Sequence, residues 1–178
     1  MSIESASTGD KRVSFPDQAA LTRGMNPGLL SGLVMAGANQ EPVAGEDDGI
    51  LTAQEISFLP LDGVESVVLS ACETGLGEVA GGEGLIGIQR AFQVAGARTT
   101  VASLWKVDDL VTRRLMEIYY RNLWEKGLSR IDALREAQLH MLDNPEITRA
   151  SLRIKKSESA KRISPYYWGA FVLSGDWR

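Results

Sequence analysis

The chain has 178 residues, 44% apolar residues and a net charge of −4, as expected for one soluble globular domain that binds no nucleic acid. One cysteine and one histidine exclude a disulfide framework and a zinc site built on several such ligands, and we expect no cofactor. No apolar run can span a membrane, and the polar start carries no signal-peptide pattern, so we expect a cytoplasmic protein.

The first part of the chain predicts an irregular segment followed by the start of a domain. Residues 1–25 are rich in Ser, Thr, Gly and charge, which predicts a poorly ordered lead-in to a domain over residues 26–178. An apolar run at residues 29–36 predicts a strand. Thr52 followed by Glu55 forms a capping box, so we expect a short helix to begin there.

The middle of the chain predicts two strands that are buried on both faces. Residues 64–70 (VESVVLS) are mostly apolar and β-branched, which is typical of a strand inside a parallel sheet. Apolar residues recur with helical spacing over residues 85–95, and a second buried strand is expected over residues 99–104.

The second half predicts helices and a closing strand. Asp108 or Asp109 can cap a helix that runs to Trp124, and Ser129 starts another that runs to Leu142. The remaining expected elements are a polar loop over residues 143–165 and a strand over residues 168–173. This alternation predicts an α/β fold with a largely parallel sheet flanked by helices.

Reactive side chains follow both predicted buried strands. Functional sites of parallel sheets lie beyond the carboxyl ends of the strands, where Cys72 and Trp105 fall. A thiol of pKa ~8.5 is a good nucleophile near neutral pH only when a base, a cation or a helix N-terminus activates it. The only histidine, His140, lies inside a predicted helix. The residues alone therefore leave Cys72 open as a nucleophile or as a small buried apolar side chain.

Several motifs resemble one known family. The stretch VVLSACETG over residues 67–75 strongly resembles the cysteine motif of CHAT domains, which are peptidase domains of the caspase and separase clan. The resemblance covers roughly residues 26–178. Further matching stretches follow in order at residues 82–84, 90–92, 95–97, 103–107 and 165–177.

The resemblance implies roles for four residues. Cys72 is implied as the nucleophile of a Cys–His dyad that attacks a peptide carbonyl. Ser103 and Trp105 match the strand that lies along the substrate backbone, with Trp105 walling a side-chain pocket. Asp109 lies in a segment similar to one in separases, where an acid recognises a basic residue before the cut bond. The alternative for Asp109 is a capping role unrelated to substrate.

One departure from the family pattern limits these implications. The family places its histidine in an Ala-Thr-His-Gly-like motif before the cysteine, and no such motif precedes Cys72. The resemblance therefore implies the C-terminal portion of a CHAT domain, whose caspase-like sheet lacks its first strands and leaves an edge open.

Three functions remain open at this point. The first is a cysteine endopeptidase domain that cuts protein or peptide substrates after basic residues and lacks its histidine base. The second is a non-catalytic interaction module with the same fold, and the third is a redox-sensing thiol. The family often carries helical repeats ahead of the domain, so a helical-repeat regulatory region is an expected partner.

Overall fold

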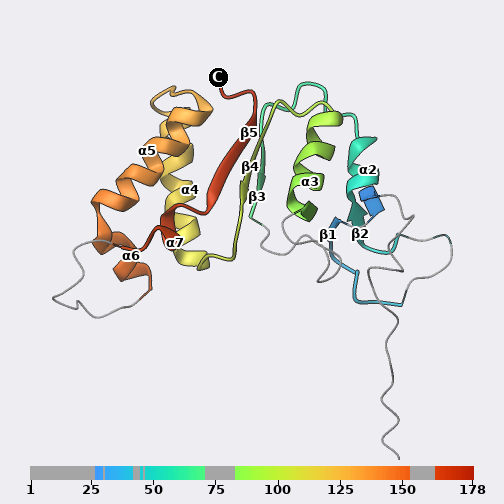
Figure 1. The fold of residues 1–178 in the computed structure, drawn as a ribbon, viewed down its shortest axis with the longest axis horizontal. Coiled ribbons are helices and arrows are strands. Elements are labelled where there is room, and N and C mark those ends of the chain that lie inside the picture. The colour runs from blue at the N-terminus through green and yellow to red at the C-terminus, as the bar shows by residue number, and fades with distance from the viewer. Residues whose placement is uncertain (1–26, 30, 42–44, 46, 71–82, 153–162) are drawn as a thin grey trace, which may run out of the picture.

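The computed structural model describes residues 27–29, 31–41, 45, 47–70, 83–152 and 163–178. It is a mixed α/β domain, as predicted, in which a small sheet lies between two layers of helices (Figure 1). A short 3₁₀ helix, η1 (Pro27–Leu29), comes first. The other elements in chain order are β1 (Gly32–Val34), β2 (Ile50–Thr52), α2 (Ala53–Ser57), β3 (Val67–Leu69), α3 (Glu83–Val94), β4 (Thr99–Ser103), α4 (Asp109–Trp124), α5 (Arg130–Asp143), α6 (Pro145–Ser151), α7 (Pro165–Trp168) and β5 (Phe171–Gly175).

The main sheet is built around β4. Strand β3 pairs with one side of β4 in parallel, with Leu69 opposite Ala102. Strand β5 pairs with the other side in the antiparallel sense, with Phe171 opposite Ser103. The expectation of a largely parallel sheet therefore holds for β3 and β4 only. Strands β1 and β2 form a separate antiparallel pair beside α2 and α3 (Figure 1).

The closing strand begins later than its sequence pattern suggests. Residues Pro165–Trp168 form the short helix α7 between the predicted loop and the predicted strand. Proline favours this helix because it suits the first helical position. The hydroxyl of Ser164 caps this helix by accepting a hydrogen bond from the backbone N–H of Tyr166. The strand itself runs from Phe171 to Gly175.

The capping box at the start of α2 is confirmed. The Thr52 hydroxyl accepts from the Glu55 backbone N–H at 3.2 Å, and the Glu55 carboxylate accepts from the Thr52 backbone N–H at 2.8 Å. These bonds favour the ionised carboxylate and lower the pKa of Glu55. The cap directs Ala53 and Ile56 into the apolar core between α2, α3 and the sheet.

The second apolar core lies on the opposite face of the sheet. Leu115 and Tyr119 of α4 are buried there with Val101 of β4 and Ala137 of α5. Helices α4 and α5 begin where the sequence predicts, because Asp108 and Ser129 are their N-caps. None of the helices in the described ranges is both long and apolar enough to cross a membrane.

The prediction of a loop over residues 143–165 is wrong in its first part. Residues Pro145–Ser151 form α6, in which proline occupies the first turn and Thr148 is buried. Packing of this short helix against α4 and α5 outweighs its polar composition. Residues 153–162 lie outside the described part of the chain.

Candidate active site

The candidate active site lies at the carboxyl edge of β3 and β4. The two strands are parallel and in register at Leu69 and Ala102, so the segments that follow them leave the sheet at the same edge. Ser103 is the last residue of β4 and is 3% exposed. Its hydroxyl has no hydrogen-bond partner among the described residues. Cys72 lies outside the described residues, three positions after Leu69 in the sequence.

Trp105 is held at this edge by an aromatic neighbour from far along the chain. Its indole Nε1 donates a hydrogen bond to the backbone carbonyl of Tyr166 at 2.9 Å. The two rings stack with centroids 6.2 Å apart and planes 19° apart. The Tyr166 hydroxyl donates to the carbonyl of Lys106, and the Tyr167 ring meets the Tyr166 ring edge-on at 5.3 Å.

Tyr166 was not among the residues that the sequence pointed to. Its signal was its place in the stretch over residues 165–177 that resembles the CHAT family, to which the sequence analysis gave no role in the site. The structure adds it to the candidate site because it contacts both Trp105 and Lys106.

The structure separates the roles of two neighbouring acids at the start of α4. The carboxylate of Asp108 is the N-cap and accepts from the backbone N–H groups of Leu110 at 2.9 Å and Val111 at 3.3 Å. Asp109 is exposed in the first turn of the helix and makes no capping bond. The capping role left open by the sequence therefore belongs to Asp108.

The two acids are expected to differ in their effect on stability. Asp108→Ala removes the cap and should lower the free energy of unfolding by about 1 kcal/mol. Asp109→Ala removes only a charge near the helix N-terminus and should cost about 0.5 kcal/mol or less. Urea unfolding of the two variants beside the wild-type chain measures both values. A larger loss for Asp109→Ala than for Asp108→Ala would contradict this assignment.

The single histidine lies on a helix and not on either of the strands that end at this edge. His140 is exposed on α5, a helix of the outer layer, near that helix's C-terminal end. Its backbone carbonyl accepts hydrogen bonds from Asn144. Within the ranges that the structure covers, no three His, Cys, Asp or Glu side chains are grouped to hold a metal ion.

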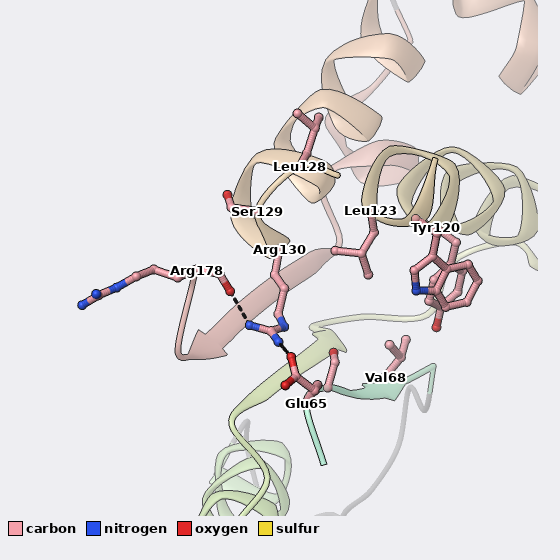
Figure 2. Close-up of a pocket in the computed structure, with 10 residues that line it drawn as sticks. Glu65, Val68, Tyr120, Leu123, Leu128, Ser129, Arg130 and Arg178 are labelled. Carbon is pink, nitrogen blue, oxygen red and sulfur yellow. Dashed lines mark hydrogen bonds and ion pairs between the residues drawn. The ribbon is translucent and has the colours of Figure 1, made fainter. Parts of the chain in front are cut away.

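A pocket of about 570 Å³ lies where α4 and the turn before α5 overhang β3 (Figure 2). Trp124, which is 74% exposed, stacks on Tyr120 at a centroid distance of 4.6 Å. Partial burial raises the pKa of Tyr120. The lining residues are Glu65, Ser66, Val68, Tyr120, Leu123, Trp124, Leu128, Ser129, Arg130 and Arg178.

An ion pair closes one end of this pocket. The largely buried guanidinium of Arg130 donates to the Glu65 carboxylate and to the backbone carbonyl of Arg178, as Figure 2 shows. Arg98 lies 3.5 Å from the same carboxylate. Because β3 pairs only with β4 among the described strands, this pocket lies beside the outer strand of the sheet.

Comparison with known proteins identifies the family of this α/β domain. The sequence model of the CHAT domain matches residues 16–176, so the chain belongs to the CHAT domain family. Over 127 residues the chain is 31% identical to Tetratricopeptide repeat protein 28 of Mus musculus and to the protein of the same name of Homo sapiens. Those matches cover 71% of this chain and 4% of each relative, so the chain spans a small fraction of either relative.

Proposed function

We propose that this chain carries the nucleophile and the substrate-binding edge of a caspase-like cysteine endopeptidase domain. The family membership supports this class of protein. The parallel ladder of β3 and β4 is the observation that carries the proposal. Because Leu69 lies opposite Ala102, the segment that leads to Cys72 and the segment that leads to Trp105 leave the sheet together.

The proposed reaction is acyl transfer to a thiol. The Cys72 thiolate attacks the peptide carbonyl carbon and forms a carbon–sulfur bond, and the backbone N–H of Cys72 is a candidate donor to the oxyanion. A base takes the thiol proton and returns it to the leaving amine as the carbon–nitrogen bond breaks. Water then hydrolyses the thioester and restores the thiol.

The base in this proposal comes from a polypeptide segment outside the 178 residues of this sequence, whose one histidine is His140. No histidine precedes Cys72 in the sequence, and the single His140 is exposed on α5. A segment that supplies the base must approach the carboxyl edge of the sheet beside β3. The outer side of β3 has no strand partner among the described residues, and the exposed Trp124 lies nearby over the pocket. These features support further strands that complete a caspase-like sheet on this side.

The substrate side chain in this proposal is basic. Asp109 offers a carboxylate that capping does not use, in the first turn of the helix that follows Trp105. A carboxylate pairs bidentately with guanidinium, and the face of a tryptophan ring attracts a cation. Together Trp105 and Asp109 suit Arg or Lys before the cut bond.

Helical repeats are the proposed partner region, and the cytoplasm is the proposed location. Both relatives are named for tetratricopeptide repeats, which are helical repeats. We therefore propose that such a region, in the same polypeptide or in a partner, regulates access to the candidate site.

Affinity labelling tests the proposal without requiring turnover. Cys72 is the only cysteine, so the mass of the chain reports on its alkylation directly. Peptidyl chloromethyl ketones ending in Arg, Leu or Asp would be compared with iodoacetamide, which needs no binding pocket. We expect saturable labelling by the Arg ketone, about tenfold faster at low concentration than by the other two ketones.

The control variant separates recognition from thiol reactivity. Asp109→Asn should remove most of the preference for Arg and leave the iodoacetamide rate unchanged. Asp143→Asn, at another exposed acid, should change neither rate. Labelling that rises linearly with each ketone and shows no preference would contradict the peptidase and favour the interaction module. Oxidation of Cys72 to sulfenic acid with no ketone preference would favour the redox sensor.

A further inference from the structure

We propose that Tyr166 is a positioning residue that fixes Trp105 as the wall of the substrate pocket, an inference that rests on the proposed function. Trp105 follows β4, whereas Tyr166 belongs to α7 and lies 61 positions later in the sequence. Helix α7 lies beside the beginning of α4 (Figure 1), so it reaches the segment that joins β4 to α4.

The segment between β4 and α4 has few anchors of its own. Leu104 is 51% exposed, although its backbone N–H donates to the carbonyl of Ala170 at 2.9 Å. Lys106 is exposed, and the next buried side chain is Val107. The Trp105 ring is half-buried against the second apolar core, and its other contacts come from outside the segment.

Tyr166 supplies three contacts that hold this segment. Its backbone carbonyl accepts from the Trp105 indole at 2.9 Å, its ring stacks on the Trp105 ring, and its hydroxyl donates to the Lys106 carbonyl. Tyr166 thus binds the tryptophan and the residue after it. A ring held at two points cannot rotate freely, so the pocket wall is set before substrate arrives.

Tyr166 is itself fixed by its helix. Pro165 restricts the backbone before it, and the Ser164 hydroxyl accepts from its N–H at 3.3 Å. Tyr167, which packs against the second core, meets its ring edge-on. Tyr166 is nevertheless 49% exposed, so filling the core does not account for its contacts with the Trp105 segment.

Two substitutions divide these contacts. Tyr166→Phe keeps the stacked ring and loses the hydrogen bond to Lys106, whereas Tyr166→Ala loses both. Each leaves the backbone carbonyl that accepts from Trp105. In labelling of Cys72 by the Arg ketone, we expect the half-saturation concentration to rise about threefold in Tyr166→Phe and about tenfold in Tyr166→Ala. The limiting labelling rate and the iodoacetamide rate should stay unchanged, because both report on the thiol.

A second stacked pair provides the matched control. Tyr120 and Trp124 stack at 4.6 Å with planes 18° apart, on α4 beside the other pocket. Tyr120→Phe and Tyr120→Ala should leave the half-saturation concentration unchanged. The indole N–H resonance of Trp105, assigned with Trp105→Phe, should shift in Tyr166→Ala and not in Tyr120→Ala.

The outcomes separate this inference from the proposed function. Saturable labelling with the wild-type half-saturation concentration in both Tyr166 variants would overturn the positioning role and leave the peptidase proposal intact. Linear labelling of the wild-type chain would overturn the proposed function and this role with it. Should Tyr166→Ala fail to fold, the threefold effect expected for Tyr166→Phe decides the matter, and its absence would overturn the role.

Discussion

The purified chain is expected to hydrolyse peptides with Arg before the cut bond no faster than its Cys72→Ala variant does. The reason is the missing base: no histidine precedes Cys72, and His140 is exposed on the outer layer of helices. An unactivated thiol is only a few per cent ionised at neutral pH. Removing one member of a nucleophile–base unit costs on the order of 10⁴-fold or more in turnover.

Fluorogenic peptides measure this prediction with two controls. His140→Ala should match the wild-type chain, because that histidine has no part in the reaction. Joining the chain to a longer polypeptide that supplies a His-Gly motif before the Cys72 strand should raise turnover, and Cys72→Ala should abolish the gain. Turnover by the chain alone that disappears in Cys72→Ala would show that the base is already present.

The largest loss of stability is expected for Leu115→Ala. Leu115 is 1% exposed in the core between α4, α5 and the sheet. Truncation there removes buried apolar surface and leaves a cavity, which lowers the free energy of unfolding by about 3 kcal/mol. For a chain of this size the melting temperature should fall by roughly 6–12 °C.

Leu110 of the same helix is the matched control. It is 50% exposed, so Leu110→Ala should change the free energy of unfolding by about 0.5 kcal/mol or less. Chemical denaturation of the three proteins compares one substitution at two positions on α4. Equal losses at both positions would mean that this helix does not present Leu115 to the core.

Local patterns predicted the elements whose boundaries are set by nearby residues. The Thr52 capping box, the caps at Asp108 and Ser129, and the apolar spacing of α4 each act within about one turn of helix. They depend on contacts between residues three or four positions apart, which a sequence displays directly. The α/β class follows from the same local patterns.

Long-range contacts account for what the sequence did not predict. The antiparallel direction of β5 depends on how helices α4, α5, α6 and α7 return the chain to β4, which no local pattern encodes. Helix α6 is stabilised by its packing against α4 and α5. Tyr166 joins the candidate site through contacts with Trp105, 61 positions away, and no local pattern in the run PYYW indicates so distant a partner.

The return of β5 to β4 also sets the order in which the domain is assembled. Ser103 pairs with Phe171, so this ladder joins residues roughly 70 positions apart, and closing so long a loop costs entropy. A ribosome releases α7 and β5 only after β3, β4 and α4. Trp105 therefore gains its aromatic partner only after α4, α5 and α6 have been synthesised. Until then the segment after β4 lacks the hydrogen bonds and the ring contact that Tyr166 provides to Trp105 and Lys106.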